Sequence, residues 1–132
     1  MSIVKPFGAI MVAVACALAI AVSSWQAVDA DTKGVRIKVK KPNGGEIWVR
    51  GDRETIKWRS FGFTGANVRI ELLQDGQLVE TIKAITPNDG RAKWVVPTDI
   101  EVDDDYTVRV ISIASPLIND TSNEEFTIIG LP

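Results

Sequence analysis

The chain has 132 residues, the length of one ordinary domain, and 45% of them are hydrophobic, which is enough for a real core. Its formal net charge is −2, so it lacks the excess of basic residues that nucleic-acid binding requires. It contains no histidine, the commonest general base of enzymes. We therefore expect neither a nucleic-acid-binding protein nor an enzyme.

Residues 1–30 are typical of a secretory signal peptide. Lys5 is followed by an apolar run over residues 7–22, and small residues at Val28 and Ala30 fit the positions before a cleavage site. We place cleavage after Ala30, which leaves a mature domain of residues 31–132, secreted or held at the cell envelope. The apolar run is also near the lower limit for a membrane span, so an uncleaved anchor is the alternative, and it would be the chain's contact with a membrane.

The single cysteine, Cys16, lies inside this apolar run. Residues 13–15 before it weakly suggest lipid attachment, but the run continues to Val22, where a lipoprotein normally turns polar. Cys16 would therefore be lost with the signal peptide. Small exported domains often depend on disulfides, so we expect this one to be held by its hydrophobic core alone.

The first predicted strand lies in the run of residues 35–41 and ends near Lys40, which places Arg36, Lys38 and Lys40 on one face. We interpret this as a solvated face that discourages edge-to-edge pairing; contact with an anionic polymer is the alternative. The next segment, "KPNGGEIW", is predicted to be a bend. Pro42 cannot donate a ladder hydrogen bond, and Gly44 and Gly45 accept backbone angles closed to other residues. The chain should cross there from one sheet to the other.

The rest of the mature region also predicts strands. Residues 68–72 and 106–110 alternate apolar with polar side chains, as half-buried strands do. Shorter segments of similar character are residues 47–49, 55–58, 78–82, 92–96 and 126–129. Asp75-Gly76 between two apolar runs predicts a tight hairpin turn. About seven short strands favour an all-β, antiparallel, Ig-like or fibronectin-III-like sandwich, with Trp48, Trp58 and Trp94 in its core.

Several segments together carry a family resemblance. They are "PNGGEIWVRGDRETIKW" (residues 42–58), "FTGANVRIEL" (63–72), "TPNDGRAKWVVP" (86–97), "YTVRV" (106–110) and "DTSNEEFTI" (120–128). In this order they resemble the N-terminal extracellular domain of the yeast cell-wall-synthesis and Ser-Thr-rich GPI-anchored membrane protein family. The resemblance implies an Ig-like sandwich at the cell surface, and fungal members are linked to β-1,6-glucan assembly. No Ser/Thr-rich stalk follows Phe126 to Ile129 in this sequence, so we expect a prokaryotic-type relative.

Phe61 and Phe63 are the aromatic residues best suited to a ligand, because they lie in a glycine-rich connection between predicted strands. In a sandwich this connection shares one end with the loops at residues 87–90 and 114–123, and such loops often form recognition surfaces. The candidate ligand-binding residues are Phe61, Phe63, Asn88, Asp89 and Asn119. Rings that only plug the end of the core are the alternative.

The acidic run from Asp103 to Asp105 is interpreted as a solvated loop before the strand that begins at Tyr106. It lacks the glycine and the spaced ligands of a calcium loop, so a weak cation site is only the alternative, and we expect no metal and no cofactor. A pair of carboxylates that hydrolyses glycosides is a third possibility.

The sequence thus predicts an exported, non-catalytic binding or structural module whose partner is cell-wall polysaccharide. The alternative is an assembly module that recognises another surface protein. Strand addition at residues 35–40 or at the final strand would serve that second role.

Overall fold

The computed structural model describes residues 34–131, which fall almost entirely within one compact unit, Val35–Pro132. The predicted signal peptide, its cleavage after Ala30, and Cys16 lie outside the described residues. Within residues 34–131, no helix has the length and apolar character needed to cross a membrane.

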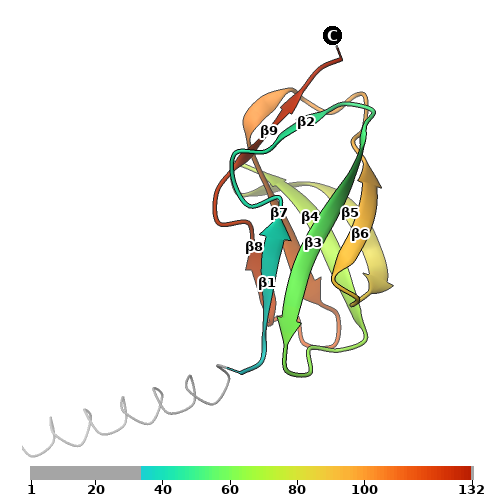
Figure 1. Ribbon diagram of the computed structural model, residues 1–132, viewed down its shortest axis with the longest axis vertical. Coiled ribbons are helices and arrows are strands. Elements are labelled where there is room, and N and C mark those ends of the chain that lie inside the picture. The colour runs from blue at the N-terminus through green and yellow to red at the C-terminus, as the bar shows by residue number, and fades with distance from the viewer. Residues whose placement is uncertain (1–33, 132) are drawn as a thin grey trace, which may run out of the picture. The chain divides into compact units, whose positions relative to one another are not determined.

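The described residues form strands joined by short turns and loops. The strands are β1 (Arg36–Lys41), β2 (Ile47–Val49), β3 (Arg53–Phe61), β4 (Asn67–Gln74), β5 (Gln77–Pro87), β6 (Arg91–Val95), β7 (Asp103–Ser112), β8 (Asn119–Thr121) and β9 (Phe126–Ile129). They build two sheets that pack as a sandwich (Figure 1). Sheet A has the order β1-β3-β6, and sheet B has the order β2-β9-β7-β4-β5, with β8 also paired to β7. The predicted all-β sandwich is confirmed.

The core lies between the sheets and receives the alternate residues of each strand. Trp48, Trp58 and Trp94 are all buried in it, as predicted. Trp48 packs against Phe126 with ring centroids 4.8 Å apart, and Phe126 packs against Tyr106 at 6.0 Å. Each fully buried large apolar side chain contributes about 1.5–3 kcal/mol, so this core is the main source of stability.

The predicted bend after β1 is confirmed, because β1 lies in sheet A and β2 lies in sheet B. Gly44 and Gly45 have φ of 138° and 82°, which side-chain-bearing residues rarely adopt. A Cβ at Gly44 would stand 2.8 Å from the Cβ of Glu124. The Glu46 carboxylate accepts two backbone hydrogen bonds: Oε2 accepts from Asn43 N at 2.9 Å, and Oε1 accepts from Gly44 N at 2.9 Å. The bend is thus a defined backbone turn with its own cap.

The predicted hairpin turn is also present. Asp75 and Gly76 connect β4 to β5 with φ of 51° and 78°, and Gln74 pairs with Gln77 across it. Positive φ at both central positions is the turn geometry that suits the twist of two antiparallel strands.

Strand β8 was missed by the sequence analysis, which placed its residues in a long loop. Its three residues, Asn119 to Thr121, are polar and carry no apolar alternation, so the pattern gave no signal. β8 forms because its backbone pairs with the end of β7, Thr121 opposite Arg109 and Asn119 opposite Ile111.

The acidic run was also placed wrongly. Asp103, Asp104 and Asp105 are the first residues of β7 and not a loop before it. Asp103 pairs with Ile128 of β9, and the backbone oxygen of Asp105 accepts a hydrogen bond from Asp75 N at 3.0 Å. Backbone pairing with neighbouring segments therefore outweighs the low strand propensity of aspartate.

Candidate functional site

Three connections meet at one end of the sandwich, as predicted from the sequence. They are the β3–β4 loop (residues 62–66), the β5–β6 turn (residues 88–90) and the β7–β8 loop (residues 113–118), here called the loop end. The backbone N–H of Asn88 donates to the oxygen of Ala66 at 2.9 Å, and the N–H of Ile113 donates to the oxygen of Asn67 at 3.2 Å. The β5–β6 turn is thus tied to the β3–β4 loop, and the β7–β8 loop is tied to Asn67, the first residue of β4.

Asn88 is the residue that holds the loop end together. Its Oδ1 accepts hydrogen bonds from Trp58 Nε1 at 2.8 Å and from Ser60 Oγ at 2.9 Å. Its Nδ2 donates to Thr64 Oγ1 at 2.7 Å and to the Gly65 oxygen at 3.0 Å. Two acceptor and two donor positions are all that an asparagine amide has. Asn88 therefore positions the loops, with its whole side-chain capacity used inside the domain.

A second set of contacts fixes the β3–β4 loop against the β7–β8 loop. The buried Ser112 Oγ donates to the Thr64 oxygen at 2.7 Å and accepts from Ser115 N at 3.0 Å. Gly65 has a φ of 99°, and a Cβ there would stand 3.1 Å from the Cβ of Ala114. These hydrogen bonds and this close packing fix the bases of the two loops against each other, and the base they form is here called rigid.

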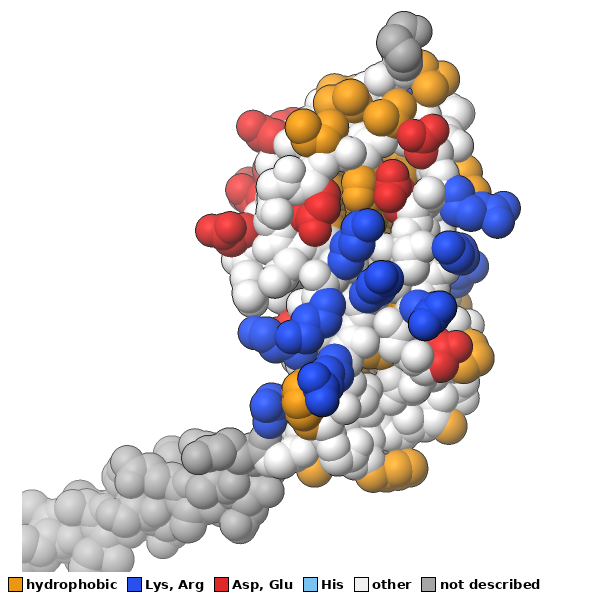
Figure 2. Space-filling model, viewed as in Figure 1, with side chains coloured by type: hydrophobic (Ala, Val, Ile, Leu, Met, Phe, Trp, Pro, Cys, Tyr) orange, Lys and Arg blue, Asp and Glu red, His pale blue; other side chains and the backbone are white. Residues whose placement is uncertain are grey.

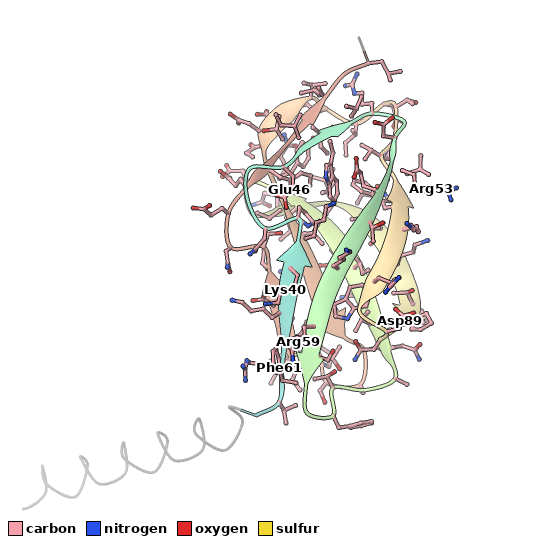
Figure 3. All side chains as sticks on the ribbon, viewed as in Figure 1. Lys40, Glu46, Arg53, Arg59, Phe61 and Asp89 are labelled. Atoms are coloured by element: carbon pink, nitrogen blue, oxygen red, sulfur yellow. The ribbon has the colours of Figure 1, made fainter. Side chains whose placement is uncertain are left out.

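The tips of these two loops carry apolar side chains that are almost fully exposed. Phe63 is 85% exposed and Leu117 is 97% exposed. Asn119, also exposed, supports the second tip, because its Nδ2 donates to the oxygens of Pro116 at 3.0 Å and Leu117 at 3.4 Å. Asp89 is exposed at the β5–β6 turn, where its Oδ1 accepts from Arg91 N at 3.3 Å (Figure 3).

Phe61 lies on a different surface from Phe63. It is the last residue of β3, not a loop residue, and points to the outer face of sheet A (Figure 3). The Arg36 guanidinium lies 4.0 Å from the centre of its ring, and the Arg59 guanidinium lies 4.9 Å away. The structure thus brings Phe63, Asn88 and Asp89 to the loop end, where Asn119 supports one of the loops. Phe61 lies instead on the outer face of sheet A, beside two arginine side chains.

The outer face of sheet A is strongly basic, and we call it the basic face (Figure 2). In the burial patterns of β1, β3 and β6, alternate residues point away from the core. These outward positions hold Arg36, Lys38, Lys40, Arg53, Thr55, Lys57, Arg59, Phe61, Arg91, Lys93 and Val95. None of these described strand positions is acidic. The cations follow the strands in rows rather than converging on one point.

The charges on sheet B are arranged in the opposite way. The buried carboxylate of Glu71 pairs with Arg109 at 2.6 Å and with Arg69 at 3.1 Å. Glu71 and Arg109 are also direct cross-strand partners in the register of β4 and β7. Sheet B therefore neutralises Arg69 and Arg109 on the protein itself, whereas sheet A leaves a surplus of positive charge.

The acidic start of β7 has no metal-binding geometry. No group of three His, Cys, Asp or Glu side chains within residues 34–131 is arranged to hold a metal ion. Burial, followed by the negative charges of Glu101, Asp105 and Asp103, raises the pKa of Tyr106 to about 12. The Tyr106 hydroxyl donates to the backbone oxygen of Glu101 at 2.5 Å. This hydrogen bond stabilises the turn that precedes β7.

Sequence reasoning found only the part of the basic face that lies on β1. Arg53, Lys57 and Arg59 of β3 alternate in the sequence with Glu54 and other residues that point to the other side of the sheet. Linear charge counting therefore made the region look neutral. Assigning faces by the period of two along residues 53–61 would have revealed the row.

Comparison with known proteins gives one result. Residues 41–128 match the family described as the Kre9/KNH-like N-terminal Ig-like domain. This range runs from the last residue of β1 into β9 and includes the whole loop end. No curated protein and no solved structure matches the chain.

Proposed function

The chain belongs to the Kre9/KNH-like N-terminal Ig-like domain family, and on that premise we propose that it is an exported, non-catalytic module that binds cell-wall polysaccharide through its loop end. The family indicates a cell-wall-associated module. The loop end supplies the surface on which such a module would bind a sugar chain.

The exposure of Phe63 on a rigid base is the observation that carries this proposal. Its ring is 85% exposed, although the loop that holds it is fixed by Asn88 and Ser112. A loop ordered before binding loses little conformational entropy when a ligand arrives. An aromatic ring held in this way can stack on the apolar face of a sugar, while Asp89, exposed at the same end of the sandwich, supplies a polar group for the hydroxyls.

The absence of histidine from the sequence supports a binding role over a catalytic one. The tips of the β3–β4 and β7–β8 loops are the apolar side chains of Phe63 and Leu117, which can contact a ligand but cannot transfer a proton. Recognition is therefore the chemistry that this end of the domain favours.

The proposal is tested by sedimenting the full chain, in a mild neutral detergent, with insoluble wall polysaccharide from the source organism. Phe63→Ala should weaken retention by about tenfold or more, the equivalent of about 1.4 kcal/mol. Ile85→Ala is the matched control, because Ile85 is 69% exposed but lies on β5. Because Phe61 and Phe63 lie on different surfaces, they are substituted separately. Unchanged binding in the Phe63 variant, whatever the Phe61 variant does, or equal loss in the Ile85 control, would contradict a loop-end site.

Recognition of another surface protein is the second candidate, and one feature of β5 favours it. β5 is one of the two edge strands of sheet B and exposes Leu78, Val79 and Ile85. The two edges expected to serve assembly are less suited to it. β9 lies between β2 and β7, and the Val39 N–H at the outer edge of β1 donates to Asp120 Oδ2 at 2.8 Å. If the wall preparation fails to retain the chain while Ile85→Ala abolishes capture of a surface protein, this candidate replaces the first.

A further inference from the structure

We propose that the basic face binds an acidic polysaccharide, specifically a chain of uronic acid sugars, laid along the strands of sheet A. This inference rests on the proposed function, since it names the chemical class of the wall polymer. It adds a second surface that the loop end does not include.

The first support is the density of positive charge. Lys38 and Arg59 are direct cross-strand partners, and so are Lys57 and Arg91. Like charges directly opposite each other destabilise an antiparallel sheet. No carboxylate within residues 34–131 forms an ion pair with any of these four side chains. The sheet therefore carries electrostatic repulsion that an external polyanion would relieve.

The second support is the contrast with sheet B in the same domain. In sheet B, Arg69 and Arg109 both form ion pairs with the same carboxylate, that of Glu71. The chain as a whole has slightly more acids than bases. The basic face is thus a segregation of charge onto one sheet, which creates a local positive potential on a protein of negative net charge.

The shape of the basic face indicates an extended ligand. Arg53 and Arg59 stand six residues apart on β3, which corresponds to about 20 Å along the strand. Lys57 lies between them on the same face. A small anion needs donors that converge on one point, whereas a linear polymer with one charge on each sugar can contact a row. The row therefore fits a chain of several sugars.

The chemistry of the side chains fits carboxylates. Arginine presents a planar fork that binds a carboxylate through two parallel hydrogen bonds, and lysine adds a compact charge. Phe61 holds one end of the row in place, because the guanidinium groups of Arg36 and Arg59 both lie over its ring. Lys93 is fixed in a similar way by a 2.9 Å hydrogen bond to Thr55 Oγ1. These contacts pre-order the side chains of Arg59 and Lys93 on the face.

The test measures binding of the full chain, in a neutral detergent, to polygalacturonate and to neutral dextran of similar length. Lys57→Gln/Arg91→Gln is compared with Arg69→Gln/Lys83→Gln, which removes the same charge from sheet B. We expect the wild type to bind polygalacturonate and not dextran. The sheet A variant should bind about tenfold more weakly, and the sheet B control should stay within about twofold. About 0.5 M NaCl should abolish binding, because it screens charges beyond a few ångströms.

Four results would overturn the inference: equal binding to dextran, equal weakening in the sheet B control, tighter binding to dextran sulfate than to polygalacturonate, or tighter binding to anionic lipid vesicles. The same variants are also sedimented with insoluble wall polysaccharide. Retention that is indifferent to salt and to the sheet A variant refutes this inference alone. If the wild type itself does not sediment with the wall polysaccharide, the proposed function is refuted.

Discussion

Lys57 of β3 and Arg91 of β6 face each other as cross-strand partners on the outer surface of sheet A, with no acid between them. An antiparallel sheet gains stability when it places opposite charges at such positions. Lys38 and Arg59 form a second pair of this kind. The positive charges of the basic face therefore lower the stability of the sheet, although the same charges would favour binding of a polyanion.

Lys57→Gln should therefore stabilise the domain by about 0.2–1 kcal/mol. The substitution removes the repulsion from Arg91 and keeps a long polar side chain on the strand. Chemical denaturation at low salt measures the effect, and added salt should reduce it because the charges are exposed. Lys83→Gln on β5 should leave the stability unchanged. A destabilised Lys57 variant would mean that the lysine stem contributes more through packing than its charge costs.

Asn88→Ala should destabilise the domain by about 1–3 kcal/mol, because the indole N–H of Trp58 and the hydroxyl of Thr64 both lose their partner. The loop end should become more mobile, with faster amide hydrogen exchange at Gly65 and Ala66. Asp89→Ala, the neighbouring substitution, removes only an exposed contact to Arg91 N and should change the stability by less than about 0.5 kcal/mol. Equal stability of both variants would contradict the role of Asn88 as the residue that joins the loops.

Asp120→Ala should make the protein self-associate. The Asp120 carboxylate accepts the backbone N–H of Val39 at the outer edge of β1. Without it, β1 offers an unpaired donor to the strand of another molecule. Light scattering or sedimentation velocity across a concentration series measures the change. Asp120→Asn keeps an acceptor oxygen and should stay monomeric under conditions in which the alanine variant associates.

The stability of the domain should depend on pH through Glu80 of β5. Burial raises the pKa of Glu80, the hydrogen bond from Trp94 partly opposes this, and the charge of Asp99 adds to the rise. The folded state therefore disfavours the ionised form. This penalty is absent below the pKa of an unfolded glutamate and grows as pH rises through the folded-state pKa.

Glu80→Gln removes that penalty and keeps an oxygen for the indole N–H. The variant should thus have a higher Tm than the wild type at neutral pH and the same Tm at about pH 3.5, where both carry a neutral side chain. Thermal melts at a series of pH values measure the difference. A variant that is less stable than the wild type at neutral pH would show that the ionised carboxylate is favourable where it lies.

The sandwich itself could be predicted from the sequence because its signals are local. The alternation in residues 68–72 and 106–110, the glycines after Pro42 and the pair Asp75-Gly76 each specify their own backbone. β8 and the acidic start of β7 could not, because their strand structure depends on a partner strand distant in sequence and not on their own side chains.

The candidate site was predicted only in part, for a related reason. Shared topology brought the loops of Phe63 and Asn88 together as expected. The side of the strand to which Phe61 points depends on where β3 ends, and element ends are the least certain part of a pattern. The full basic face needs the lateral order β1-β3-β6, which no single segment of the sequence contains.

The most direct test of the central claim is to map where wall sugars touch the domain. Soluble oligosaccharides released from the source organism's wall are titrated into the isotope-labelled full chain in neutral detergent, and the backbone amide NMR signals are followed. Binding through the loop end predicts shifts concentrated at residues 62–66 and 113–118, reduced in Phe63→Ala. Shifts confined to β5, or no shifts at saturating sugar, would contradict it.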